Sequence, residues 1–189
     1  ADIIVTATGF NLSANGDIEF AVDGKKLDFA DTVTYRGMMF TGVPNLAWVF
    51  GYFRASWTLR SDLIGDFVCS LLNHMKAKGV TKVVPTLRAE DHNMPLLPFI
   101  DGENFNPGYL QRALPILPKR GTKPEWMHNQ DYWAEKDEIP ATNLDDAAFQ
   151  YDAGSGLEPV IDTSELYFEG ISQGAIMGGA LTALSPDFT

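Results

Sequence analysis

The stretch from Gly37 to Gly79, GMMFTGVPNLAWVFGYFRASWTLRSDLIGDFVCSLLNHMKAKG, carries the clearest structural signal in this chain. Its second half predicts one long helix, because apolar residues recur there at three- and four-residue intervals, as a single buried face requires. Ser56 is suited to cap the start of this helix, and Gly79 is suited to end it in a left-handed conformation. The face expected to be buried contains Leu59, Leu63, Ile64, Phe67, Val68, Leu71, Leu72 and Met75, and the opposite face contains Arg60, Asp62, Asp66, Asn73 and Lys76.

The loop that precedes this helix, Gly51 to Arg54, is the first candidate binding position. The first turn of a helix has N–H groups without intrahelical partners, and these groups point toward whatever lies beside the loop. The polar edge of a cofactor is one candidate for that place. A capped core helix without any ligand fits the pattern equally well.

Short apolar runs predict strands on both sides of the helix. Asp2 to Thr8 (DIIVTAT) is β-branched and bounded by Gly9, which is typical of a buried strand. Asn15-Gly16 and Asp23-Gly24 are hairpin-turn dipeptides, so we expect a small antiparallel excursion between them. Further strands are expected at residues 32–35, 38–40, 46–50 and 80–85.

From residue 86 to residue 153 the chain is rich in proline, and aromatic residues are interleaved with the prolines. Dense proline excludes long regular elements, whereas so many large rings argue against a free linker. We therefore expect an extended tail with one short helix near residues 108–114. Such a tail should wrap over a parent domain with more surface than residues 1–85 provide.

Composition excludes several functional classes. The chain has 189 residues, of which 45% are hydrophobic, so it can bury a core. Its formal charge of −11 argues against nucleic-acid or anionic-membrane binding. No apolar run approaches the roughly 18 residues of a membrane span. The single cysteine, Cys69, permits no intramolecular disulfide, so we expect a reducing compartment and a cytoplasmic protein.

Gly170-Ile171-Ser172-Gln173-Gly174 is a G-x-S-x-G motif between a predicted strand and a predicted helix. A sharp turn at this place would present the hydroxyl of Ser172 as a nucleophile, and the N–H of Gln173 could stabilise an oxyanion. The acid and histidine of an α/β-hydrolase follow the serine in chain order, yet no histidine follows Ser172 here. The elbow therefore lacks its triad. The joint near Gly154 suggests a boundary between residues 1–152 and residues 153–189.

Metal and dinucleotide motifs are missing from the sequence. None of the three histidines, His74, His92 and His128, has metal-ligand spacing with a carboxylate or with Cys69, so surface or packing roles are expected and no metal site is predicted. No G-x-G-x-x-G occurs, so the sequence supports no self-contained dinucleotide site.

Several segments resemble one enzyme family. Asp2 to Phe10 (DIIVTATGF) is similar to the D-x-I-I-x-A-T-G-[FY] segment of flavin-dependent monooxygenases. Taken together, the motifs resemble the C-terminal part of Baeyer–Villiger monooxygenases of the ethionamide-activating type over roughly residues 1–150. The other matching segments are GMMFTGVPNLAWVFGY, ASWTLRSDL, FVCSLLNHM, FNPGYLQR, LPKRG, Trp126 and NQDY. Arg54 departs from the family, in which many members carry Asn.

The resemblance implies an α/β fold, the C-terminal portion of a flavoprotein with two dinucleotide-binding domains. It implies FAD and NADPH as cofactors, with insertion of one oxygen atom from O2 into a ketone or oxidation of a sulfide. The missing N-terminal flavoprotein part would be a required partner, and the chain alone would be catalytically incomplete. By the same resemblance, Ala7, Thr8 and Gly9 would lie at the junction of the NADPH and FAD regions. The residues that would approach the flavin are Gly51, Tyr52, Ser56 and Trp57.

Residues 153–189 resemble instead the nucleophile-elbow segment of an α/β-hydrolase. Two alternatives to a monooxygenase part remain. One is a serine hydrolase with Ser172 as nucleophile and the rest of its triad on missing sequence, and the other is a non-catalytic piece that docks on a partner through the aromatic tail.

Overall fold

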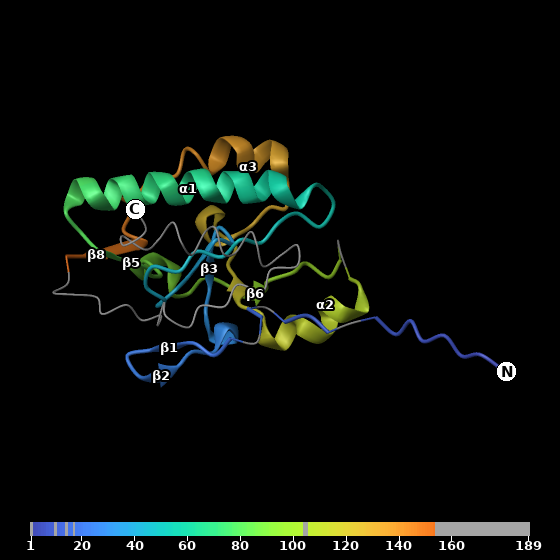
Figure 1. Cartoon of the computed structure of the whole chain (residues 1–189). Helices are drawn as coiled ribbons and strands as arrows, with labels where there is room; N and C mark the ends of the chain where they lie inside the picture. Colours follow the sequence, from blue (N-terminus) through green and yellow to red (C-terminus); the bar gives the residue numbers. More distant parts are fainter. Residues whose placement is uncertain (1, 10, 14, 17, 104–105, 154–189) are drawn as a thin grey trace, which may run out of the picture.

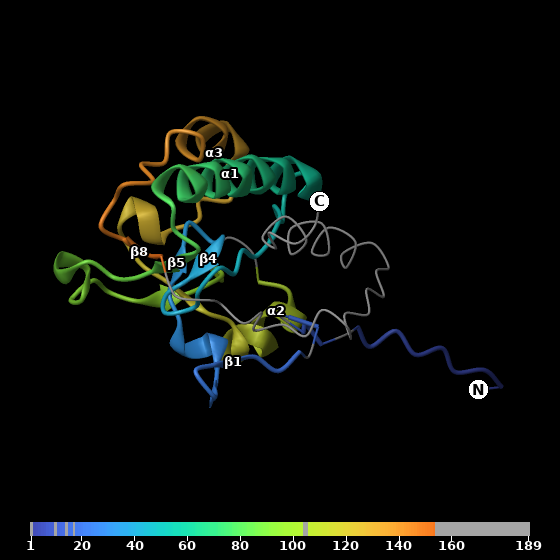
Figure 2. The same ribbon diagram turned by 60° about the vertical axis from the view of Figure 1, so that its left-hand side comes forward.

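The long predicted helix is the main element of the structure. The computed structural model describes residues 2–9, 11–13, 15–16, 18–103 and 106–153. Helix α1 (Trp57–Lys78) runs along one side of the molecule, with α3 (Tyr132–Glu138) beside it, in both views of the ribbon (Figures 1 and 2). Gly79 ends α1 in the left-handed conformation, with φ 66° and ψ 31°, so both ends of the helix are close to those predicted.

The strands are short, and in the described residues they form antiparallel pairs instead of one large sheet. The pairs are β1 (Ala21–Val22) with β2 (Lys25–Lys26), β3 (Thr34–Tyr35) with β4 (Met39–Phe40), β5 (Lys82–Pro85) with β8 (Phe149–Asp152), and β6 (Leu97–Pro98) with β7 (Lys119–Arg120). The remaining elements are α2 (Gly108–Ala113) and the 3-10 turns η1 (Phe29–Asp31), η2 (Ala89–Asp91), η3 (Leu114–Ile116) and η4 (Pro124–Trp126). The described part is therefore a small mixed α/β structure.

Two apolar clusters form the core. The first lies under α1, where its buried side chains Ile64, Phe67 and Leu71 meet residues of β3, β5 and β8. The second is formed around Phe40, Trp48 and the residues of α2, and Trp57 at the start of α1 packs against it. The apolar stripe of α1 predicted the first cluster, because a helix with one apolar face is stable only when that face is covered.

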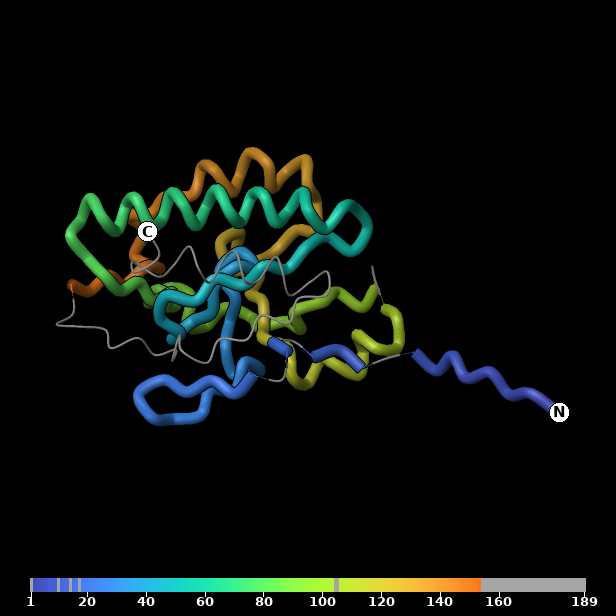
Figure 3. Tube along the Cα trace, in the orientation of Figure 1, coloured from blue at the N-terminus to red at the C-terminus, as the bar shows by residue number. Residues whose placement is uncertain are grey.

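The first predicted strand is wrong for the structure in hand. Residues 2–9 have no regular structure and project from the body of the molecule, as the tube in Figure 3 shows. Ile3, Ile4 and Val5 are each more than 80% exposed. A β-branched run forms a strand only where a neighbouring strand completes its hydrogen bonds, and no such strand lies beside it among the described residues.

Two further predictions near the core need correction. Residues 46–50 are mostly buried, as expected, but they form no regular strand: the segment is extended chain with one isolated bridge to β4, Met39–Ala47. Arg60 was expected on the solvent face of α1, yet it is completely buried. The physical reason is a buried carboxylate that pairs with it from α3, far along the chain.

Part of the proline-rich tail is covered by the first half of this chain, and not by a separate parent domain as predicted. Its residues Trp126, Ile139 and Phe149 are buried in the same cluster as the α1 stripe, and β8 pairs with β5 at the position Val83–Tyr151. The predicted short helix is confirmed as α2, whereas α3 was not predicted. The tail thus closes back on the first half of the chain.

None of the helices in the part of the chain that the structure describes is long and apolar enough to cross a membrane. The predicted hydrolase-like segment lies outside the described residues from residue 154 onward, so the boundary predicted before it stays a prediction.

Candidate functional site

The loop from Gly51 to Ser56, which leads into α1, is held by the segment that precedes α3. The side-chain amide of Gln130 makes two hydrogen bonds with the loop backbone. Its Nε2 donates to the carbonyl of Gly51 at 3.1 Å, and its Oε1 accepts from the N–H of Phe53 at 2.8 Å. An amide side chain that both donates and accepts fixes the two ends of this short backbone stretch.

Gly51 is required by the close approach of an aromatic ring. A Cβ atom at this position would lie 2.2 Å from Cδ2 of Trp57, so no larger residue fits without movement of the indole. The same indole packs on Phe50, with ring centroids 5.2 Å apart. The glycine therefore lets the first residue of α1 fold back over the loop that precedes it.

A buried polar network joins the loop, α1 and α3. The carboxylate of Glu135, which is 3% exposed, accepts a hydrogen bond from the Tyr52 hydroxyl at 2.6 Å and one from Nε of Arg60 at 2.8 Å. The guanidinium of Arg60 also donates to the carbonyls of Phe50 at 2.7 Å and Arg36 at 2.6 Å. Burial raises the pKa of Tyr52, and its hydrogen bond to the Glu135 carboxylate raises it further, so Tyr52 stays a neutral donor.

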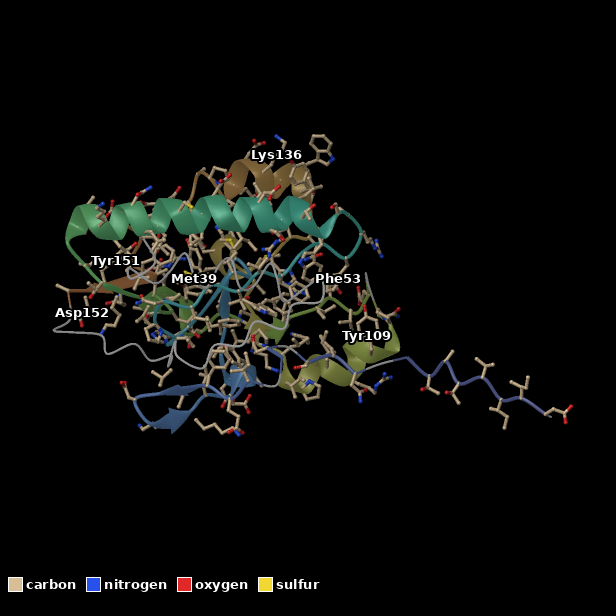
Figure 4. The ribbon with its side chains drawn as sticks, in the orientation of Figure 1. Met39, Phe53, Tyr109, Lys136, Tyr151 and Asp152 are labelled. Carbon is tan, nitrogen blue, oxygen red and sulfur yellow. The ribbon has the colours of Figure 1, made fainter. Side chains whose placement is uncertain are left out.

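A cavity of about 420 Å³ opens beside this loop. It lies between the loop, the segment after β6 and the segment from Met127 to Gln130. In the side-chain view of Figure 4, Phe53 lies near the N-terminal end of α1 and Tyr151 near its C-terminal end, which places the cavity at the N-terminal end of the helix. Its lining residues are Phe53, Arg54, Phe99, Ile100, Asp101, Arg120, Met127, His128, Asn129 and Gln130.

His128 in the cavity wall is neutral. Its ring stacks on Phe99 with centroids 4.1 Å apart, and its Nε2 lies 2.5 Å from the carbonyl oxygen of Phe99. Burial lowers the pKa of His128 to about 3, and the nearby positive charge of Arg60 acts in the same direction. At neutral pH the Nε2–H therefore donates to Phe99, and Nδ1 faces the amide of Gln130 at 3.5 Å as an acceptor.

The structure brings together some of the predicted site residues and separates others. Gly51 and Tyr52 are buried at the loop, and Trp57 begins α1 beside them. Ser56 occupies the N-cap position, but its hydroxyl contacts the hydroxyl of Thr58 at 2.8 Å and caps no backbone N–H.

Ala7, Thr8 and Gly9 lie in the exposed N-terminal segment, away from the loop in Figures 1 and 3. Their predicted place at a junction of cofactor regions stays a prediction. Ser172 lies outside the described residues, so its role as a nucleophile also stays a prediction.

The contact residues of the 127–138 segment were not predicted. Gln130 was noted only as part of the NQDY segment of the family resemblance, and Glu135 was given no role. Their partners lie 75 or more positions earlier in the chain, so no local pattern could have indicated them. The one available local signal for α3 was Asp131, a residue type that favours the N-cap position of a helix.

Among the described residues, no group of three histidine, cysteine or acidic side chains is arranged to hold a metal ion. Cys69 is exposed on α1 and is not disulfide-bonded. The polar groups that line the cavity, two guanidiniums among them, fit an organic ligand better than a metal.

Comparison with known proteins connects this arrangement to one group of enzymes. The chain is 40% identical over 151 residues to the FAD-containing monooxygenase EthA of Mycolicibacterium smegmatis and 41% identical to EthA of Mycobacterium tuberculosis. It is 34% identical over 152 residues to the probable FAD-binding monooxygenase AlmA of Acinetobacter baylyi. Some 80% of this chain is homologous to part of these monooxygenases.

The homology is limited to part of each relative. The chain spans about 30% of the length of the curated relatives that it matches. No family model matches the sequence, and no solved structure matches it. The relatives therefore identify the group of proteins to which this segment is similar, and what the whole enzymes do is taken up as a proposal below.

Proposed function

We propose that this chain is the C-terminal part of an FAD-dependent monooxygenase that uses NADPH and oxidises a small ketone or sulfide. The observation that carries the proposal is the identity of 40% over 151 residues with an enzyme described as an FAD-containing monooxygenase. The Baeyer–Villiger reaction, insertion of oxygen beside a carbonyl, is the reaction type implied by the sequence motifs. The chain supplies one portion of the site and is catalytically incomplete by itself.

The described residues fit one edge of a flavin. The N-terminus of α1, a helix of 22 residues, follows a loop that hydrogen bonds from Gln130 hold in place. The partial positive charge of this helix end favours a ring edge that becomes electron-rich on reduction. The adjoining cavity is lined by aromatic rings and by hydrogen-bonding side chains. The part of FAD that these residues do not fit is the pyrophosphate, because the sequence has no glycine-rich phosphate loop.

A bound flavin would supply the redox chemistry and the activation of O2. The residues of this chain would orient the ring, through the backbone of the Gly51–Ser56 loop, and exclude water from it through Phe53 and Trp57. Neither Tyr52 nor His128 is an acid at neutral pH in this structure, since the pKa of Tyr52 is raised and that of His128 is lowered. Both residues therefore act as fixed hydrogen-bonding groups, and neither supplies a proton.

A segment exchange tests the proposal. The 151 residues of this chain that align with the M. smegmatis relative replace their counterpart in that enzyme, and the chimera is purified. We expect bound FAD after gel filtration and NADPH-dependent O2 uptake that increases with added ketone or sulfide. A chimera that is folded by circular dichroism but colourless and inactive would contradict the proposal.

The isolated chain is the matched control. Because it has no phosphate loop, we expect it to elute colourless from gel filtration after incubation with FAD. A stoichiometric flavin spectrum in the isolated chain would show that the upstream part is not required, and the interpretation as a portion of a larger site would be wrong.

A further inference from the structure

Three successive residues of the candidate loop are each held by a side chain from the segment that leads into and forms α3. Gly51 and Phe53 are held by Gln130, and Tyr52 between them is held by Glu135. We propose that Gln130 and Glu135 are positioning residues, which fix the Gly51–Phe53 backbone in the conformation that receives the flavin edge. This inference rests on the proposed function and extends it to residues of the proline-rich tail.

The backbone of Gln130 supports this role. It has φ of 54°, a left-handed conformation that is uncommon for residues other than glycine, asparagine and aspartate. Such a conformation persists where the surrounding contacts determine it, and these residues concentrate at ligand clamps. Here the strained backbone places the amide between two loop groups 77 and 79 positions away in the chain.

The contact made by Glu135 is of a different kind. Its carboxylate is buried beside Arg60 of α1 and accepts a hydrogen bond from the Tyr52 hydroxyl. This one charged group of α3 therefore connects the loop to both helices. Arg60 in turn donates to the carbonyl of Phe50, the residue just before the loop. Gln130 thus fixes the backbone of the loop. The Glu135–Arg60 pair fixes the side chain of Tyr52 and the carbonyl of Phe50, the residue just before the loop. A packing role alone would not require polar contacts to consecutive residues.

Amide hydrogen exchange on the 189-residue chain tests the first half of the inference without any flavin. In Gln130→Leu, which removes both hydrogen bonds, we expect the Phe53 amide to exchange about tenfold faster or more, as expected for the loss of one to two hydrogen bonds. The matched control is Gln150→Leu at an exposed position of β8, and the amides of Phe67 and Leu71 in α1 report whether the core is intact.

The variant Gln130→Glu distinguishes loss of the hydrogen bond to Phe53 from a general disturbance of the fold. It keeps an oxygen acceptor for the Phe53 N–H and removes the donor to Gly51. We expect the Phe53 amide to remain protected in this variant. Unchanged exchange at Phe53 in Gln130→Leu, with an intact core, would overturn the inference, and equal acceleration in both variants would do the same.

FAD affinity of the segment-exchange chimera tests the second half. We expect the dissociation constant for FAD to rise about tenfold in Gln130→Leu and to be unchanged in Gln150→Leu. Faster exchange with an unchanged dissociation constant would make Gln130 a purely structural residue and overturn the inference. If the unsubstituted chimera binds no FAD, the proposed function is wrong and this inference is wrong with it. That outcome is distinguishable from the others, because it is observed before any residue is substituted.

Discussion

Asp91 and Glu135 are the two buried carboxylates among the described residues, and their surroundings differ. Asp91, with no exposed surface, accepts from Nε of Arg88 at 2.7 Å, from Nε1 of Trp126 at 2.9 Å and from Lys123. Glu135 accepts from Arg60 and from the Tyr52 hydroxyl. Both groups connect distant segments, but only Glu135 lies beside the candidate site.

The difference lies in the partners of the two arginines. Arg88 also contacts Glu125 and Asp146, each at 3.2 Å, so its charge would be compensated without Asp91. Among the described residues, Glu135 is the one carboxylate paired with Arg60, whose other acceptors are carbonyl oxygens. The comparison teaches that, among the described residues, no second carboxylate pairs with Arg60 if Glu135 is replaced. Arg88, in contrast, keeps Glu125 and Asp146 if Asp91 is replaced.

Glu135→Gln should therefore produce the largest loss of stability. It leaves the Arg60 charge buried without a counter-charge, and breaking a buried pair in this way costs about 3–5 kcal/mol. The measurement is the free energy of unfolding from urea denaturation. Glu90→Gln, the same chemical change at an exposed side chain, is the control and should cost little. Equal losses in the two variants would contradict the account of the Arg60–Glu135 pair.

Asp91→Asn should destabilise the protein less, by about 1.5–3 kcal/mol, the range for hydrogen bonds to a charged group. Burial alone would raise the pKa of Asp91, but hydrogen bonds from Arg88, Lys123 and Trp126 outweigh it and hold that pKa well below its usual range. Urea denaturation again gives the free energy. A loss as large as that of Glu135→Gln would remove the proposed distinction between the two networks.

His128 should make stability depend on pH. Its pKa is about 3 in the folded protein and near 6.5 in the unfolded chain, so the unfolded chain binds the extra proton between these values. Its contribution to stability is thus complete above about pH 6.5 and is lost as the pH falls toward 3, at up to about 1.4 kcal/mol per pH unit. Urea denaturation at several pH values should show this slope, reduced in His128→Asn. Equal slopes in both proteins would contradict the neutral, buried His128.

Tyr52→Phe should give the smallest effect, about 1 kcal/mol, because it removes one hydrogen bond and leaves the Arg60–Glu135 pair intact. Thermal unfolding of this variant beside Tyr109→Phe, a change of the same kind on α2, measures the difference. A loss that equals that of Glu135→Gln would mean that the hydroxyl, and not the ion pair, dominates the network.

The sequence predicted the elements whose information is local. The stripe of Ile64, Phe67 and Leu71 and the cap at Gly79 appear within one stretch of chain, so helix α1 and its buried face could be predicted. The turn at Asp23-Gly24 was predictable for the same reason, and β1 and β2 flank it.

Elements that depend on distant partners could not be predicted. Arg60 is polar and lies on the predicted solvent face, and the carboxylate that compensates its buried charge, Glu135, lies 75 positions later in the chain. The strand predicted around Ile3 to Val5 was wrong for the converse reason. The residues have the composition of a strand, but no partner strand lies beside them among the described residues. For the site, the loop could be predicted from the start of the helix, but its contacts with Gln130 and Glu135 could not.

The central claim is that the Gly51–Ser56 loop and the start of α1 receive the edge of a flavin. The most direct test is amide hydrogen exchange of the segment-exchange chimera, measured without flavin and after reconstitution with FAD. We expect FAD to slow exchange of the amides from Gly51 to Thr58 and to leave those near Gly79, at the other end of α1, unchanged. Unaltered exchange from Gly51 to Thr58 in a chimera that holds FAD would contradict the account.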